Sequence, residues 1–296
     1  MDWDKLRIFH AVAEAGSFTR AGEQLNLSQS AVSRQIGALE ESLKTPLFHR
    51  HARGLILTEQ GELLYRAAHE VSAKLAMTAA VLTDLKDRPS GELKVTTTVA
   101  FGSIWVAPLV REFVDLYPEV SLSMVLDDSE LDLSMRQADV ALRMRKPVQG
   151  DLVHRKLLTV HYHLCAAPDY LRRHGTPKTI EELDGHRLIV YGDEAPTPIA
   201  DVNWLIRAGA GRDRRRHPTL RMNNIYGIKL AMESGLGIAA LPDYIVHGST
   251  RTVRVLPNVD GPSFDMYFVY PEELRNSKRI AVFRDFLVRK VAEWKF

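Results

Sequence analysis

The sequence has a single cysteine, Cys165, among its 296 residues. One cysteine cannot form a disulfide within the chain or supply a cysteine-rich zinc site. Cys165 lies in the apolar run 164–167, so we predict a small buried side chain rather than a redox sensor. No apolar run approaches the roughly 18 residues of a transmembrane helix, and residues 1–4 lack the features of a signal peptide. We therefore expect a cytoplasmic protein with no membrane partner.

Catalytic and cofactor motifs are also missing. The sequence contains no HExxH, GxGxxG, Walker A or GxSxG pattern. His161 and His163 alternate on a strand-like run, but no third residue lies at a metal-ligand spacing. Asp127 and Asp128 end another strand-like run, where a turn or capping role is the usual one. We therefore predict no catalytic residues, no metal site and no cofactor.

Strong charge of one sign is absent too. The net charge is +2, so any surface that binds nucleic acid must be local. This balance disfavours a non-specific architectural DNA protein, which is expected to be strongly basic. Residues 209–218, GAGRDRRRHP, form a basic glycine-rich stretch that we interpret as a solvated surface loop. The length is typical of two domains, and the hydrophobic fraction of 45% is that of a globular protein.

The first 57 residues predict three short helices followed by a hairpin. The helices are expected over 4–16, from Ser17 to about Leu25, and over 28–43 with Ser28 as N-cap. In the third, apolar residues recur at helical spacing: Val32, Ile36, Leu39 and Leu43. A tight turn between the second and third helices is typical of a helix-turn-helix. The strand-like runs 46–48 and 55–57 flank a basic tip and predict a wing.

Polar side chains gather on the face of the third helix opposite the apolar stripe. The N-terminal part of such a helix reads base edges in the major groove, where Gln suits adenine and Arg suits guanine. Basic residues on the wing suit phosphate or minor-groove contacts. The candidate DNA-contacting residues are Thr19, Arg20, Gln29, Ser30, Ser33, Arg34, Arg50 and Arg53.

A long helix is predicted over 59–88, with Thr58 as its N-cap. Its apolar positions follow a heptad pattern: Leu64, Ala68, Val71, Leu75, Thr78, Leu82 and Leu85. This spacing favours pairing with the same helix of a second chain. The alternative is a long helix that packs on its own domain. Residues 89–91, Pro-Ser-Gly, are expected to end the helix and act as a hinge.

From residue 92 onward, strand-like and helical runs alternate, which is typical of an α/β fold with a parallel sheet. The first strands are expected at 93–99, 120–126 and 139–144, with helices at 104–117 and 131–137. Later strands are expected at 162–166, 188–191, 237–241 and 266–269, and later helices at 225–234 and 277–294. We predict two lobes, about 92–160 with 266–296 and about 161–265, with the chain crossing near 159–161 and 263–265.

The ends of the predicted strands indicate where a ligand binds. Open α/β sheets bind ligands beyond the carboxyl ends of their strands, and helix N-termini there suit an anion. We expect a small anionic inducer whose carboxylate is held by Ser103, Thr98 or Arg143, with Tyr191 and Phe101 as apolar walls. The full candidate set for this site is Thr98, Phe101, Ser103, Asp127, Arg143, Tyr191, Asn224 and Ile225.

Two segments, LRIFHAVAEAGSFTRAGEQLNLSQSAVSRQIGALE and LFHRHARGLILTEQG, resemble the LysR-type transcriptional regulators. The resemblance continues through VSLSMVLDD, ADVALRMR, RLIVYG and ESGLGIAALPDYI. The segments MDWDKLRIFHAVAEAGSFT, ALPDYIV and FRDFLV look closest to a subgroup that includes VtlR and LsrB.

The resemblance implies a winged helix-turn-helix over 1–58, a dimerisation helix over 59–88 and a periplasmic-binding-protein-like effector domain over 89–296. It further implies a homodimer or a dimer of dimers, an inducer between two lobes, and promoter DNA and RNA polymerase as partners. The competing interpretation is an enzyme fused to a DNA-binding module. The resemblance does not identify the inducer, the operator or the sign of regulation.

Overall fold

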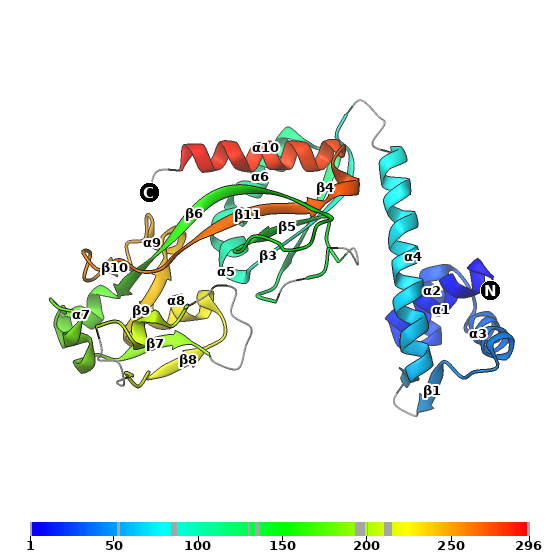
Figure 1. Ribbon diagram of the computed structural model, residues 1–296, viewed down its shortest axis with the longest axis horizontal. Helices are drawn as coiled ribbons and strands as arrows, with labels where there is room; N and C mark the ends of the chain where they lie inside the picture. Colours follow the sequence, from blue (N-terminus) through cyan, green and yellow to red (C-terminus); the bar gives the residue numbers. More distant parts are fainter. Residues whose placement is uncertain are drawn as a thin grey trace. The chain divides into compact units, whose positions relative to one another are not determined.

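The structure is a computed structural model that divides into two compact units, residues 1–83 and 84–296 (Figure 1). It describes residues 2–51, 54–83, 88–129, 131–133, 137–192, 199, 201–209 and 215–294. Some of the predicted features lie outside this range. In the wing they are Arg53 and the side chain of Arg50. In the heptad pattern they are Leu85 and the side chains of Thr78 and Leu82, and much of the basic loop 209–218 is also outside.

The first unit contains the three predicted helices and the predicted hairpin. The helices are α1 (Trp3–Ala15), α2 (Phe18–Leu25) and α3 (Gln29–Leu43), and the antiparallel hairpin is β1 (Phe48–His51) with β2 (Gly54–Leu57). Asn26 ends α2 with a φ of 54°, in the left-handed conformation that makes a tight turn. A Cβ atom on Gly22 would lie 2.6 Å from the carbonyl oxygen of Leu27, so this turn requires glycine at that position.

The apolar stripe of α3 accounts for most of its packing. Val32, Ile36 and Leu39 are fully buried in a core shared with α1. Leu43, predicted to continue the stripe, is 38% exposed. Leu43 is the last residue of α3, and Lys44 after it adopts a left-handed conformation that ends the helix. Ser28 caps the helix as predicted, accepting a hydrogen bond from the backbone N–H of Ala31 at 3.2 Å.

The long helix α4 (Glu59–Thr83) begins after Thr58, whose hydroxyl accepts a hydrogen bond from the N–H of Gly61 at 3.0 Å. The first two heptad positions belong to the core of the first unit, since Ala68 is buried in it and Leu64 packs against it. The next two, Val71 and Leu75, are 42% and 50% exposed. The helix therefore packs on its own domain near its start, and its predicted seam is exposed at Val71 and Leu75.

The second unit begins with a parallel βαβ arrangement. β3 (Gly91–Thr97) pairs in parallel with β4 (Val120–Leu126) on one side and β5 (Val140–Arg143) on the other. A continuous helical segment follows β3, formed by α5 (Val99–Phe101), a π-helical turn (Gly102–Val106) and α6 (Ala107–Leu116).

The helix predicted over 131–137 is not found in its described part, because residues 131–133 form an irregular segment and a turn. The segment is instead held by side-chain hydrogen bonds. The carbonyl of Leu131 accepts one from Arg143 at 2.8 Å, and Gln137 accepts one from the N–H of Asp132 at 2.9 Å.

Two long strands join the lobes (Figure 1). β6 (Leu152–Ala166) and β11 (Ser263–Pro271) run antiparallel and side by side, and Ser263 pairs with His161 where they pass between the lobes. Only the last five residues of β6 were predicted as strand, because its first half contains the consecutive exposed polar residues 154–156, which interrupt the alternation of a strand. The sheet order is β4-β3-β5-β11-β6-β9-β7-β8, so a single sheet runs through both lobes.

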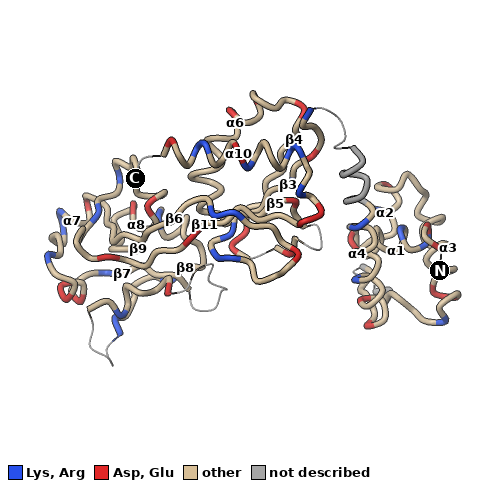
Figure 2. The backbone as a smooth tube through the Cα atoms, turned by 45° about the horizontal axis from the view of Figure 1, so that its top comes forward, with Lys and Arg blue, Asp and Glu red and all other residues tan. Residues whose placement is uncertain are grey.

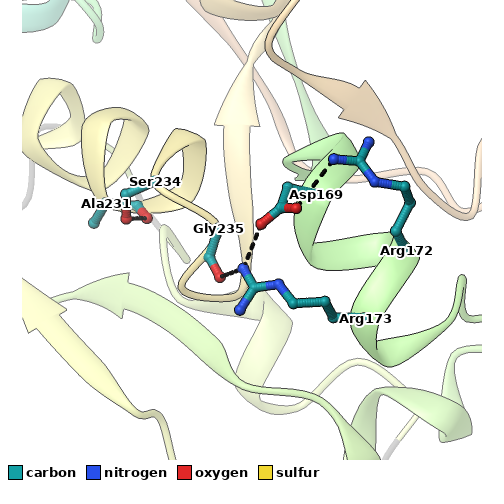
Figure 3. Close-up of polar contacts among 6 residues, drawn as sticks. All are labelled: Asp169, Arg172, Arg173, Ala231, Ser234 and Gly235. Atoms are coloured by element: carbon teal, nitrogen blue, oxygen red, sulfur yellow. Dashed lines mark hydrogen bonds and ion pairs between the residues drawn. The ribbon is translucent and has the colours of Figure 1, made fainter.

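The second lobe contains β7 (Leu188–Tyr191), β8 (Leu220–Met222), β9 (Ile238–Pro242) and β10 (Val253–Arg254). Its helices are α7 (Pro168–His174), α8 (Ile225–Glu233) and α9 (Asp243–Val246), with 3₁₀ turns at Glu181–Gly185 and Trp204–Ile206. Figure 3 shows how α7 is tied to the turn after α8: Arg173 donates hydrogen bonds to Asp169 at 2.6 Å and to the carbonyl of Gly235 at 3.3 Å.

The C-terminal helix α10 (Lys278–Glu293) follows the 3₁₀ turn Glu272–Leu274 and packs on the first lobe. Phe283 contacts Phe113 of α6 and Phe268 of β11, with ring centroids 5.0 and 6.2 Å apart. On the first-lobe part of the sheet, a second and smaller apolar cluster forms around Leu133 and Val269. Among the described residues, no helix is both long enough and apolar enough to cross a membrane.

Candidate functional site

The exposed face of α3 carries the predicted base-reading residues. Gln29, Ser30 and Arg34 are exposed and Ser33 is half-buried, while the opposite face is fully buried. The guanidinium Nε of Arg34 lies 3.4 Å from the carbonyl oxygen of Ser30, which places the side chain along the first turn of the helix. Thus the polar face that a major groove would meet is rigidly backed by the core.

Further candidates flank this face. Thr19 and Arg20 lie exposed in the first turn of α2, and the backbone of Arg50 lies in β1 of the wing, where it pairs with Leu55. Lys and Arg are interspersed with Asp and Glu in both units (Figure 2). Along the described residues the two signs of charge are therefore mixed, and we expect local side chains to supply both phosphate and base contacts.

In the second unit, three predicted inducer-site residues line one cavity. Thr98, Asp127 and Arg143 surround a space of about 30 Å³ beyond the carboxyl ends of β3, β4 and β5. This volume holds about two water molecules, whereas sites for small ligands usually span roughly 300–1,000 Å³. The space at these strand ends is therefore smaller than a site for a small ligand.

Two of these residues already have partners. The guanidinium of Arg143 is buried and donates hydrogen bonds to the carbonyl of Leu131 at 2.8 Å and to Gln149 at 3.4 Å. Asp127 accepts hydrogen bonds from the N–H and hydroxyl of Ser129, and these lower the pKa of its carboxyl. By contrast, the buried hydroxyl of Thr98 has no hydrogen-bond partner among the described residues.

Asp128 also lines the cavity of Thr98 and Arg143, and the sequence analysis did not select it as an inducer-site residue. One carboxylate oxygen accepts a hydrogen bond from the N–H of Val99 at 3.0 Å, at the N-terminus of the first-lobe helix. The other accepts one from the side-chain amide of Asn224 at 2.9 Å, in the second lobe. Burial raises the pKa of Asp128, and these hydrogen bonds oppose the shift. Asp128 therefore places a carboxylate of the chain itself at the N-terminus of the first-lobe helix, whereas the sequence analysis assigned an inducer carboxylate to Ser103, Thr98 or Arg143.

Asn224 and Ile225 begin the second-lobe helix as predicted. Asn224 caps α8 by accepting a hydrogen bond from the N–H of Gly227 at 3.0 Å, so both ends of its side chain are engaged. Ile225 and Tyr191 line a second cavity of about 10 Å³. The Tyr191 hydroxyl is buried and has no partner within the part of the chain that the structure describes, and burial together with the charge of Asp128 raises its pKa to about 12.

The structure places Phe101 and Ser103 differently from the prediction. Phe101 is fully buried, stacked on Trp105 at 4.9 Å and edge-on to Tyr244 at 5.1 Å, so it belongs to the core. Ser103 was expected at a helix N-terminus, but the helical segment already begins at Val99. Ser103 therefore lies within the π-helical turn, beyond the free N–H groups that an anion would use.

A larger cavity of about 370 Å³ lies beside the C-terminal half of β6. It is lined by His161, His163, Asp243, Val246, His247 and Arg254. The Nδ1 atom of His161 lies 3.4 Å from a carboxylate oxygen of Asp243, which gives an ion pair when His161 is protonated. The paired histidines of the sequence thus share one face, as their spacing implies.

Comparison with known proteins matches both units. The family described as "Bacterial regulatory helix-turn-helix protein, lysR family" matches residues 3–62, and the "LysR substrate binding domain" matches residues 86–292. The HTH-type transcriptional regulator CrgA of Neisseria meningitidis serogroup C is 31% identical over 292 residues, which cover 97% of this chain and 96% of the relative. DmlR of Escherichia coli is 29% identical over 97% of this chain and 94% of its own length.

Solved structures agree. CrgA from Neisseria meningitidis superposes with a TM-score of 0.62 at 30% identity, covering 98% of this chain and 99% of that one. Full-length AphB of Vibrio cholerae superposes with a TM-score of 0.60 at 27% identity, and the match again covers 98% of this chain and 99% of that one. The matched relatives are transcriptional regulators, so the alternative of an enzyme fused to a DNA-binding module is rejected. The chain belongs to the LysR family, and it is a DNA-binding transcriptional regulator with a two-lobed effector-binding domain.

Proposed function

We propose that this regulator reads promoter DNA with the N-terminal half of α3 and responds to a small anionic inducer that replaces the Asp128 carboxylate between the lobes. The proposal of an anionic inducer is supported by the hydrogen bonds from Val99 and Asn224 to Asp128, because they define an anion position with donors from both lobes. An inducer carboxylate would take over these donors, with the unpartnered hydroxyl of Thr98 as a third.

The DNA-binding part of the proposal assigns base contacts to Gln29, Ser33 and Arg34, and backbone contacts to Thr19, Arg20, Ser30, Arg50 and Arg53. A dimer would present two α3 helices to half-sites about one helical turn apart. The exposed apolar side chains of Val71 and Leu75 on α4 support pairing through this helix.

Further parts of the proposal rest on the sequence alone. Placement in the subgroup of VtlR and LsrB depends on the three segments quoted above. Assembly as a dimer of dimers and contact with RNA polymerase depend on the family resemblance. A regulator of promoter DNA acts where the DNA is, which in a bacterial cell is the cytoplasm.

The test is a reporter strain that carries the operator, supplied with a panel of small carboxylic acids one at a time. Promoter output and operator occupancy are measured in the same cells. We expect one acid to change output in the parent, and Thr98→Val to weaken that response while operator occupancy is kept. The valine has nearly the volume of threonine but lacks the hydroxyl, so the fold is preserved.

The matched control is Arg254→Ala, in the larger cavity beside β6. If Arg254→Ala abolishes the response and Thr98→Val does not, the inducer binds in that cavity and the assignment to the cleft is wrong. If no acid changes output but a neutral or cationic compound does, the anionic character of the inducer is contradicted.

A further inference from the structure

Three potential metal ligands meet between α1 and α4 in the first unit. His10 and Glu14 are four residues apart on α1 and so share a face of that helix, and His69 faces them from the third turn of α4. The Nε2 atom of His10 lies 2.9 Å from the Nδ1 atom of His69. A carboxylate oxygen of Glu14 lies 3.7 Å from the first nitrogen and 3.9 Å from the second.

These separations fit a single metal ion. With zinc bonds of about 2.0–2.1 Å, two ligand atoms of a tetrahedral shell are roughly 3.3 Å apart. The three observed distances, 2.9, 3.7 and 3.9 Å, bracket this value. Small side-chain rotations would therefore let all three atoms bind one ion just outside the plane that they define, and would break the His10–His69 hydrogen bond.

The two imidazoles are shielded from solvent, and His10 is stacked against the ring of Tyr65 at 5.4 Å. The imidazole side chains of His10 and His69 are 14% and 21% exposed, whereas that of Glu14 is 47% exposed. The open side at Glu14 leaves room for solvent to complete the shell.

We propose that His10, Glu14 and His69 form a binding site for a divalent transition-metal ion, with zinc as the best fit, that fastens the start of α4 to α1. The two nitrogens and one carboxylate oxygen are donors that such ions accept, and water is the fourth ligand. The site would fix the helix that leaves the DNA-binding domain. Sequence spacing did not reveal it, because His69 is distant from the other two residues along the chain.

The experiment uses the full-length protein after removal of metal by a chelator. Titration with Co²⁺ is expected to give one equivalent per chain and the visible absorption bands of a four-coordinate ion, which Zn²⁺ then removes. His10→Gln and His69→Gln should each weaken the affinity about tenfold or more. Glu14→Gln tests the carboxylate at a side chain too exposed to affect folding. His154→Gln, an exposed histidine on β6, is the control and should bind as the parent does.

A second variant separates coordination from a structural effect. His69→Cys should add an intense thiolate-to-Co²⁺ band in the near ultraviolet, which appears only if residue 69 binds the ion directly. Unchanged Co²⁺ stoichiometry and affinity in both His69→Gln and Glu14→Gln would overturn the proposal. So would the absence of a thiolate band in a His69→Cys protein whose circular dichroism matches that of the parent, since the three residues would then form only a hydrogen-bonded cluster.

Discussion

A carboxylate oxygen of Asp128 lies 2.9 Å from the side-chain nitrogen of Asn224, so that a residue of the first lobe binds the helix cap of the second. A double-mutant cycle measures this link. Asp128→Ala removes the acceptor, and Asn224→Ser removes the donor while keeping an oxygen that caps α8. We expect each change to lower the free energy of unfolding by about 1–2 kcal/mol, with a coupling energy between the two changes near 1 kcal/mol. Denaturant titration of the parent, the two single variants and the double variant measures these values. Strictly additive effects would show that the contact contributes nothing.

The pH dependence of stability should also depend on Asp128. Burial raises the pKa of this carboxyl in the folded state above its value in the unfolded chain. The folded state therefore binds the proton more tightly, so this residue disfavours folding at high pH, and stability is gained as the pH falls through the raised pKa toward about 4.

Unfolding free energies of the parent and Asp128→Ala, measured between pH 4 and 7, test this sign. Subtracting the two curves removes the contributions of other groups, including Asp127 and Asp243. The parent should gain relative to the variant as the pH is lowered. A difference that is constant, or that has the opposite slope, contradicts the account of Asp128 as a half-buried carboxylate.

The open part of α4 predicts the effect of a charge on assembly. Leu75 is 50% exposed in the chain alone, and glutamate there would place two like charges at the centre of a paired helix. We expect Leu75→Glu to dissociate the dimer and to lose operator affinity with it, as followed by analytical ultracentrifugation and gel retardation. Val148→Glu, at a side chain that is 98% exposed in the second unit, serves as the control. A dimeric Leu75→Glu protein would exclude the seam.

Cys165 should resist thiol reagents. It is fully buried, and burial raises the pKa of its thiol to about 12. At pH 8 the thiolate fraction is then roughly a thousandfold lower than for a thiol of pKa 9. Reaction with a chromogenic disulfide should be slow in native protein and rapid in denaturant. Equal rates in the two states would show that the residue is accessible and would reopen a redox role.

Local pattern was enough to predict the helix with a one-sided apolar stripe and the short apolar strands of the parallel sheet. The stripe of α3, its Ser28 cap and the parallel strands β3 to β5 all follow from spacing and capping chemistry. The first half of β6 was missed because its exposed polar residues hide the strand period, which is set by pairing with β11, distant in sequence.

In the candidate inducer site, too, some residues could be assigned from the sequence and others could not. Asn224 could be assigned as a cap from its position before an apolar helical run. The role of Asp128 could not be assigned, because Asp127 and Asp128 have the same side chain and only the folded chain determines which one turns toward Val99 and Asn224. The cluster of His10, Glu14 and His69 could not be predicted either, because His69 is distant from the other two along the chain and meets them only in the folded structure.

Base reading by α3 is tested most directly by comparing the parent and Arg34→Ala against a library of operator variants at fixed salt. The account predicts that Arg34→Ala loses about 1–3 kcal/mol on the best site and relaxes the preference at one base position in each half-site. Arg50→Ala is the matched basic variant on the wing. It should weaken binding evenly across the library and reduce the salt slope by about one unit. An Arg34→Ala protein that ranks and binds every variant as the parent does would contradict the assignment of α3 as the helix that reads DNA.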